Sequence, residues 1–181
     1  MAEFLENIDK SWTLFLDRDG VINRKIVGDY VQSWGAFQLI PGVLESMSVF
    51  AKQFGRVIVV TNQQGIGKKM MDEAALNAIH NEMKKEIQQA GGRLDAIYYC
   101  PDLETKPNNC RKPGIAMALQ ARKDFPEIEF SKSIMVGDSA SDMLFGITAG
   151  MYTVFVGYQA PKNFTSDLRL DNLFELASLI K

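Results

Sequence analysis

The chain has 181 residues, of which 46% are hydrophobic and 23% are charged. This length and composition are typical of a globular protein with a sizeable core, and we expect a single domain over residues 1–181. The formal net charge is −2, so nothing indicates a nucleic acid or an anionic membrane as a partner. No apolar run has the length of a membrane span and the N-terminus lacks the features of a signal peptide. We therefore expect a cytoplasmic protein, either a monomer or a small homo-oligomer.

Apolar runs alternate with helical patterns along the whole chain. Strands are predicted at residues 12–16, 56–60, 94–99, 133–136 and 152–156. Helices are predicted over residues 43–54, 76–87, 115–122, 140–149 and 172–180. Nearly continuous apolar strands are typical of a parallel sheet covered on both faces. The alternation predicts a doubly wound α/β fold, with a mainly parallel sheet and helices on both faces, in which ligands bind beyond the carboxyl ends of the strands.

The first predicted strand ends in two carboxylates, Asp17 and Asp19, followed by Gly20. In an extended chain, side chains two residues apart point to the same side. Such like charges are costly together unless a cation neutralises them, and Mg²⁺ prefers oxygen ligands. The sequence therefore predicts a magnesium site at this strand end. An exposed acidic turn is the alternative.

Three further strand ends carry polar side chains. Thr61 opens a glycine-containing loop suited to phosphate oxygens, and Asp138 and Asp142 follow the fourth strand. Lys112 precedes Pro113, which favours a helix start and would place the lysine near a helix N-terminus. Each has a plainer interpretation: Thr61 as a turn cap, Lys112 as a solvated surface cation, and Asp138 as a helix N-cap. The functional interpretation predicts all four groups at one end of the sheet.

Together these motifs resemble the haloacid dehalogenase (HAD) superfamily of phosphotransferases, over about residues 12–156. The family motifs match Asp17 to Val21, then Thr61, Lys112, and Asp138 to Asp142. In more detail, four segments are similar to the branch that contains D-glycero-D-manno-heptose 1,7-bisphosphate phosphatases and histidinol-phosphate phosphatases. These segments are residues 15–23, 60–63, 99–101 and 110–113.

The resemblance implies a phosphomonoester hydrolase that works through an aspartyl-phosphate. Asp17 would attack phosphorus and Asp19 would act as general acid and base. Mg²⁺ would be held by Asp17, the backbone carbonyl of Asp19, and Asp138. The remaining roles concern phosphate and substrate. Thr61 and Lys112 would hold phosphoryl oxygens, Asp142 would orient Lys112 or the metal waters, and Asn62, Gln63 and Arg111 would contact the substrate, a small phosphorylated metabolite.

The loop after the third strand departs from this branch, whose members often hold zinc there with Cys-x-His and Cys-x-Cys pairs. Cys100 and Cys110 match the first and last ligands, but Asp102 and Asn108 stand at the other two positions. Structural zinc normally has four nitrogen or sulfur ligands, so we predict that zinc is absent. We do not expect a disulfide in a reducing compartment. His80, the one histidine, is expected on the surface of its helix.

No segment is long enough for a large cap domain, so we expect an open site covered by loops, with Tyr30 and Trp34 forming a small flap. Without a second catalytic domain, the 7-phosphate of heptose 1,7-bisphosphate is the favoured substrate group. The short Cys100–Cys110 loop favours histidinol phosphate instead. A phospho-aspartate signalling receiver is the remote alternative. It is disfavoured because its acceptor aspartate follows a middle strand, whereas here the middle strand precedes Thr61.

Overall fold

The fold is built on one six-stranded sheet. The computed structural model describes residues 2–157 and 165–180; the predicted domain of residues 1–181 also takes in residues 1, 158–164 and 181, which lie outside the described residues. The strands are β1 (Thr13–Leu16), β2 (Arg56–Asn62), β3 (Ala96–Cys100), β4 (Ser133–Gly137), β5 (Tyr152–Val156) and β6 (Leu168–Leu170). Their order is β3-β2-β1-β4-β5-β6, and each neighbouring pair is parallel.

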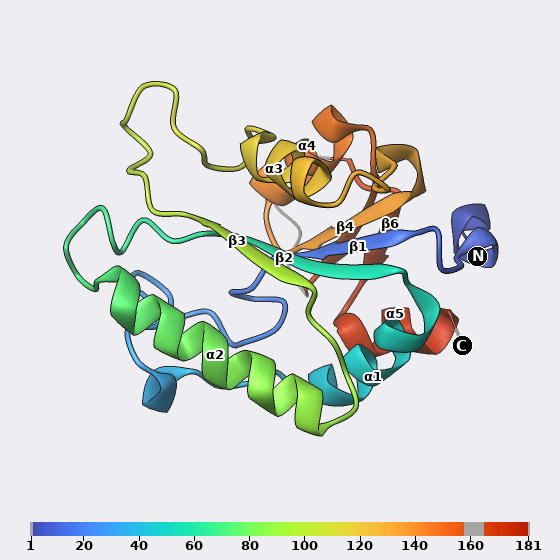
Figure 1. The fold of residues 1–181 in the computed structure, drawn as a ribbon, viewed down its shortest axis with the longest axis horizontal. Helices are drawn as coiled ribbons and strands as arrows, with labels where there is room; N and C mark the ends of the chain where they lie inside the picture. The colour runs from blue at the N-terminus through green and yellow to red at the C-terminus, as the bar shows by residue number, and fades with distance from the viewer. Residues whose placement is uncertain (1, 158–164, 181) are drawn as a thin grey trace.

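Helices cover both faces of this sheet. They are α1 (Val43–Gln53), α2 (Glu73–Gln89), α3 (Ala116–Asp124), α4 (Ala140–Ala149) and α5 (Leu173–Leu179). Short 3-10 helices span Glu3–Asn7, Trp34–Ala36 and Phe130–Lys132. In Figure 1, α3 and α4 lie above the sheet, and α1, α2 and α5 lie below it. The predicted doubly wound α/β fold is confirmed, and the sheet in the described residues is parallel throughout.

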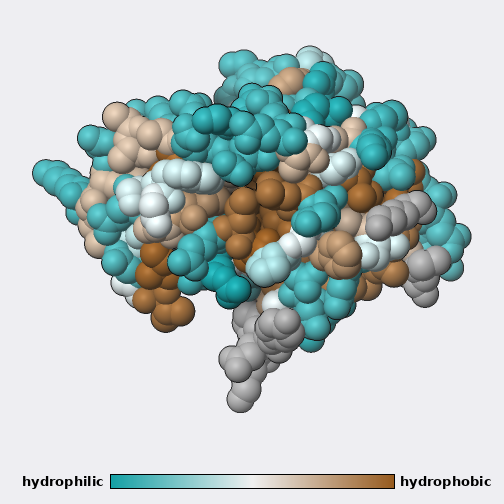
Figure 2. Space-filling view, turned by 90° about the horizontal axis from the view of Figure 1, so that it is seen from below, coloured by the Kyte–Doolittle hydropathy of each residue, from teal (hydrophilic) through white to brown (hydrophobic). Residues whose placement is uncertain are grey.

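Two hydrophobic clusters fill the space between the helices and the sheet. Along β1, Leu14 and Leu16 belong to the cluster under α1, α2 and α5, whereas Phe15 belongs to the cluster under α3 and α4. This alternation follows from the two-residue period of a strand. Because both faces are covered, every residue of β1 is buried. Figure 2 shows the face that α1, α2 and α5 cover, where apolar surface lies among hydrophilic side chains.

Some predicted boundaries differ from the structure. β6 was not predicted, because it has three residues and none of them is fully buried, so it lacks the apolar run that marks the other strands. The helix α3 begins at Ala116 with Ile115 as its N-cap. Pro113 therefore lies outside the helix, in a turn closed by the bond from Gly114 N to Arg111 O at 2.8 Å. Lys112 is positioned by that turn rather than by the first turn of a helix.

The segment between β1 and α1 is short and forms no inserted domain. It contains only the 3-10 helix Trp34–Ala36 and isolated bridges among its described residues. Tyr30 of this segment lines the pocket described below, whereas Trp34 stacks on Phe37 with ring centroids 4.9 Å apart. Of the predicted flap, only Tyr30 lines the pocket. No helix in the described part of the chain is long and apolar enough to cross a membrane.

The contact between α4 and the sheet depends on Gly146. A Cβ atom there would lie 2.7 Å from Thr153 Cγ2 and 2.9 Å from Met135 Cβ. We expect Gly146→Ala to lower the free energy of unfolding by about 1–3 kcal/mol through overpacking, although alanine alone would favour the helix. Urea unfolding followed by circular dichroism tests this. Leu144→Ala, at an exposed position of the same helix, is the control, and a more stable Gly146→Ala protein would contradict the packing account.

Candidate active site

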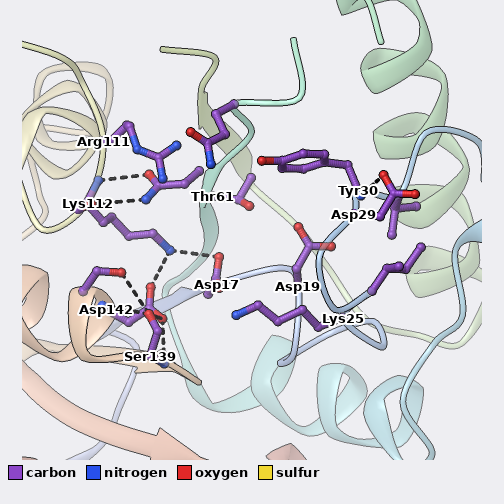
Figure 3. Close-up of a pocket in the computed structure, with 15 residues that line it drawn as sticks. Asp17, Asp19, Lys25, Asp29, Tyr30, Thr61, Arg111, Lys112, Ser139 and Asp142 are labelled. Atoms are coloured by element: carbon purple, nitrogen blue, oxygen red, sulfur yellow. Dashed lines mark hydrogen bonds and ion pairs between the residues drawn. The ribbon is translucent and has the colours of Figure 1, made fainter. Parts of the chain in front are cut away.

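The predicted residues gather around one pocket at the carboxyl ends of β1, β2 and β4. The pocket has a volume of about 230 Å³. Seven of the predicted site residues line it, and Figure 3 labels six of them, which converge from separate elements: Asp17, Asp19, Thr61, Arg111, Lys112 and Asp142. Asn62 also lines the pocket, whereas Gln63 and Asp138 do not appear among its lining residues. The remaining lining residues are Lys25, Ile26, Asp29, Tyr30, Val31, Gln64, Ser139 and Ser141.

Lys112 is buried at the centre of this arrangement. Its Nζ atom lies 2.8 Å from Asp17 Oδ1 and 2.5 Å from Asp142 Oδ1, and it donates to Val60 O at 2.8 Å. Burial alone would lower the pKa of Lys112, but the charges of Asp142 and Asp17 outweigh it and raise the pKa. The ammonium group is therefore fixed in its charged form. The interpretation of Lys112 as a solvated surface cation is wrong.

The main chain around Lys112 is held by β2. The Asn62 amide donates to Lys112 O at 3.2 Å, and Asn62 Oδ1 accepts from Lys112 N at 3.0 Å. Thr61 precedes Asn62 as a buried residue within β2, so it does not cap a turn. Its Oγ1 accepts a hydrogen bond from Gln63 Nε2 at 3.0 Å and borders the pocket. In the view of Figure 3, the Lys112 ammonium lies to the left of the Asp17 carboxylate and the Thr61 side chain to its upper right.

Asp142 fixes the position of Lys112 relative to helix α4. It lies in the first turn of α4, where its Oδ2 accepts from Ser139 N at 3.1 Å and from Ser139 Oγ at 2.5 Å. Its other oxygen faces Lys112, so α4 and Lys112 are joined through one buried carboxylate. Ser139 is the N-cap of α4. The alternative in which Asp138 caps this helix is therefore wrong, and Asp138 is left available to the site.

Asp17 and Asp138 offer oxygen atoms to a cation. Ligand atoms of Asp17, Asp138 and Asp142 all lie within 4.8 Å of one another. Burial raises the pKa of Asp17 to about 7. The charge of Lys112 opposes this shift, and the neighbouring carboxylates add to it. Burial also raises the pKa of Asp138, although Lys25 opposes this shift with Nζ 3.0 Å from Asp138 Oδ2. The positive charge nearby is too small to neutralise these carboxylates. Their oxygen atoms are the kind of ligand that Mg²⁺ prefers.

The shape of the backbone supports the same assignment. Gly20 has φ +91°, and a Cβ atom at this position would collide with the Asp138 carboxylate. Only glycine fits where the loop after β1 passes beside Asp138. Both oxygens of Asp142 are engaged, one by Lys112 and the other by Ser139. Asp17 pairs with Lys112 through Oδ1, and Asp138 pairs with the exposed Lys25, so these two side chains could hold the metal.

Asp19 has a different environment from Asp17. Its carboxylate accepts from Arg18 Nη2, from Asn23 Nδ2 at 2.8 Å and from Gln63 Nε2 at 2.8 Å. Burial alone would raise the pKa of Asp19, but the Arg18 charge and these hydrogen bonds lower it. Gln63 is fully buried behind Asp19. The prediction that Gln63 contacts substrate is not supported by this geometry, and Gln64 is the glutamine that lines the pocket.

His80 is not on the helix surface, and that prediction is wrong. It is a buried residue of α2, and its Nε2 lies 3.1 Å from Arg18 Nη1. Arg18 is itself fully buried. The sequence motifs did not indicate a role for Arg18 or Lys25. The available signal for Arg18 was its place between two aspartates, but this position alone does not reveal that its guanidinium contacts Asp19 and His80.

Cys100 and Cys110 form a disulfide, with Cα atoms 5.5 Å apart, so the expectation of unpaired thiols is wrong. The bond closes the loop that leads to Arg111 and Lys112. Asp102 accepts from Cys110 N at 3.1 Å and pairs with Lys106 at 2.6 Å. Sulfur and carboxylate atoms of Cys100, Asp102 and Cys110 lie within 4.8 Å of one another, but a disulfide offers no thiolate to zinc. The absence of zinc stays a prediction.

Comparisons with known proteins agree with this geometry. The family model for HAD-hydrolase-like proteins matches residues 109–166. The D-glycero-alpha-D-manno-heptose-1,7-bisphosphate 7-phosphatase of Mycobacterium bovis is 34% identical over 177 residues, which cover 95% of this chain and 93% of the relative. The D-glycero-beta-D-manno-heptose-1,7-bisphosphate 7-phosphatase of Salmonella typhi is 36% identical over 180 residues, covering 93% and 94% of the two chains.

A solved structure gives the same class. The D,D-heptose 1,7-bisphosphate phosphatase of B. bronchiseptica, complexed with magnesium and phosphate, has a TM-score of 0.81 at 28% identity and covers 92% of this chain and 96% of its own. Fold and site are thus those of a HAD-like phosphatase. The chain belongs to the HAD-like hydrolase family, in its D-glycero-D-manno-heptose-1,7-bisphosphate 7-phosphatase branch.

One reason given against a signalling receiver is wrong. The strand that contains Thr61 is β2, whereas β1 lies between β2 and β4 in the sheet. Asp17 therefore follows a central strand, as a receiver's acceptor aspartate does. The distinction comes instead from the relatives, which match along nearly the whole chain and are phosphatases.

Metal binding should depend on pH because Asp17 and Asp138 must be ionised to bind it. Burial raises the pKa of Asp17 to about 7 and raises the pKa of Asp138. Protons therefore compete with Mg²⁺ below neutral pH. At 100 times its Kd at pH 8, Mg²⁺ should raise Tm by about 5–10 °C, and at pH 5.5 the same concentration should raise it far less. Thermal unfolding with and without Mg²⁺ measures both shifts.

Asp138→Asn is the control for this metal prediction, and it should remove most of the shift at pH 8. Equal shifts at the two pH values, or a full shift in Asp138→Asn, would contradict the assignment of these carboxylates.

The disulfide predicts that protein purified without reductant has no free thiol, since Cys100 and Cys110 are the chain's two cysteines. Thiol titration under denaturing conditions should find none before reduction and two per chain afterwards. Elemental analysis of the same sample tests for zinc. Two thiols without reduction, together with stoichiometric zinc, would show that the loop is held by metal.

Proposed function

We propose that this protein removes the 7-phosphate of D-glycero-D-manno-heptose 1,7-bisphosphate. The observation that carries the proposal is the buried Lys112, held between Asp17 and Asp142 in the lining of the pocket, in a chain that matches phosphatases of this substrate along nearly its whole length. A phosphorylated sugar is the substrate class that the relatives' names supply. The enzyme needs an anionic nucleophile and an anionic substrate to meet, and a fixed buried cation reduces their repulsion.

The reaction follows from the positions of the two aspartates of the first motif. Asp17 attacks phosphorus in line with the sugar oxygen, so that one P–O bond forms as the other breaks. Asp19 gives its proton to the departing sugar oxygen, and then takes a proton from the water that attacks the aspartyl-phosphate. Lys112 and Thr61 hold phosphoryl oxygens during both steps. Asp17, Asp138 and the backbone carbonyl of Asp19 would hold Mg²⁺, which would supply positive charge near the transferring group.

A substrate with two phosphates fits the charges around the pocket. Beyond Lys112, the lining carries the cationic side chains Lys25 and Arg111. Arg111 is part-buried and donates to Asp102 O at 3.4 Å, so its guanidinium is anchored beside the pocket. Lys25 and Arg111 can meet the sugar and the phosphate that is not cleaved. Histidinol phosphate has a single phosphate and an ammonium group, and it uses these two cations less well.

Replacing the nucleophile tests the covalent mechanism. Asp17→Asn keeps the side-chain shape but removes the nucleophilic charge, so kcat should fall by at least about 1,000-fold. Phosphate release measures the rate, and circular dichroism checks that the fold is kept. A rate near that of the unaltered protein would exclude Asp17 as the nucleophile.

Substrate preference separates the two candidate reactions. We expect kcat/KM for heptose 1,7-bisphosphate to exceed that for histidinol phosphate by at least about 100-fold, because polar groups built for the second phosphate stay unpaired with the smaller substrate. Parallel assays with the α and β anomers identify the preferred sugar, since relatives of both names match this chain. A higher kcat/KM for histidinol phosphate would overturn the heptose assignment.

A further inference from the structure

A buried chain of side chains joins helix α2 to Asp19. Arg18 has no exposed surface, and its guanidinium has two polar partners. Nη2 donates to Asp19 Oδ1 at 3.1 Å and to Asp19 Oδ2 at 3.0 Å. Nη1 lies 3.1 Å from Nε2 of His80, the only histidine in the chain. The mechanism above gives no task to Arg18 or His80.

The chemistry of arginine fixes the state of His80. A guanidinium group donates hydrogen bonds and accepts none, so Nε2 of His80 must be the acceptor. The ring is then neutral, with its proton on Nδ1. Burial and the Arg18 charge both lower the pKa of His80, to about 3, which agrees with a neutral ring. His80 Nε2 thus accepts a hydrogen bond from Nη1 of Arg18 and links α2 to the Arg18 guanidinium.

Few other interactions fix the position of the Arg18 side chain. Its Nε atom is buried without a hydrogen-bond partner, and the Phe37 ring centroid is 5.9 Å from its Cζ atom. If Nε2 of His80 were removed, a second guanidinium nitrogen would lose its polar partner in a buried place. The guanidinium would then turn, and the Asp19 carboxylate would lose the donor that contacts both of its oxygens.

We propose that His80 and Arg18 are positioning residues that fix the Asp19 carboxylate for proton transfer to the leaving oxygen. His80 acts only through Arg18, and neither residue touches the substrate. The proposal rests on the proposed function, because it takes Asp19 as the general acid. Asn23 and Gln63 also hold Asp19, so loss of His80 should misplace the acid without removing it.

The leaving group makes this proposal testable. When a sugar phosphate is cleaved, the P–O bond breaks while Asp19 transfers its proton to the alkoxide. When p-nitrophenyl phosphate is cleaved, the phenolate leaves without that proton. Misplacing Asp19 should therefore slow transfer from the sugar phosphate and leave transfer from the aryl phosphate nearly unchanged. A purely structural loss would slow both substrates alike.

The decisive variants are His80→Leu, which removes the acceptor, and His80→Gln, which can restore one. We expect His80→Leu to lower kcat/KM by about 30–100-fold on the sugar phosphate and by less than about 3-fold on p-nitrophenyl phosphate. His80→Gln should recover most of the loss. Met83→Leu, one turn further along the same buried face of α2, is the matched control and should change neither value appreciably. Equal losses on both substrates, or no loss, would overturn the proposal.

A second measurement does not depend on activity. Because the chain has one histidine, its imidazole ¹⁵N signals are assigned without ambiguity. We expect the neutral tautomer with a proton on Nδ1 from pH 5 to 8. A proton on Nε2, or a charged ring in this range, would overturn the proposal even if the enzyme acts on another phosphate ester. Failure to hydrolyse heptose bisphosphate, with the expected tautomer present, would count against the proposed function alone.

Discussion

The site depends on one buried ion pair network, in which Lys112 lies between Asp17 and Asp142. Buried charges are costly to desolvate, and they persist only when each has well-placed partners. Here the partners come from separate parts of the chain: Asp17 follows β1, Asp142 lies in the first turn of α4, and the main chain of Lys112 is bonded to Asn62 at the end of β2. Formation of the network therefore requires the central strands and α4 to be in place together.

The two aspartates of the first motif are two residues apart and yet differ in their electrostatics. Burial raises the pKa of Asp17 to about 7, whereas Arg18 and neutral donors bring the pKa of Asp19 below its usual range. Environments that separate two carboxyl groups in this way are typical of sites that use them for different tasks. Asp19 must carry a proton when the sugar oxygen leaves. An arriving phosphate dianion is a like charge, and it opposes the ionisation of Asp19 and favours that proton.

The architecture was largely predictable from the sequence, because each buried strand is a short apolar run and each helix has an apolar stripe. The residues at four strand ends were predicted to share one rim because strand direction in a parallel sheet determines it. The partners of buried polar groups were not predictable in this way. His80 was assigned to a helix surface because a single polar residue on a helix is usually exposed, and only the three-dimensional structure brings it to Arg18. The Cys100–Cys110 disulfide was not predicted because a reducing compartment was assumed, and the sequence does not show that the two cysteines lie close together.

The central claim is that Asp17 accepts the phosphoryl group, and trapping that adduct tests it most directly. Enzyme mixed with heptose bisphosphate and Mg²⁺ is quenched in acid during turnover, reduced with borohydride and analysed by peptide mass spectrometry. Borohydride converts an aspartyl-phosphate to homoserine, so homoserine should appear at position 17 and only when substrate was present. Homoserine at position 19 or 138, or none at any aspartate while phosphate is released, would contradict the account.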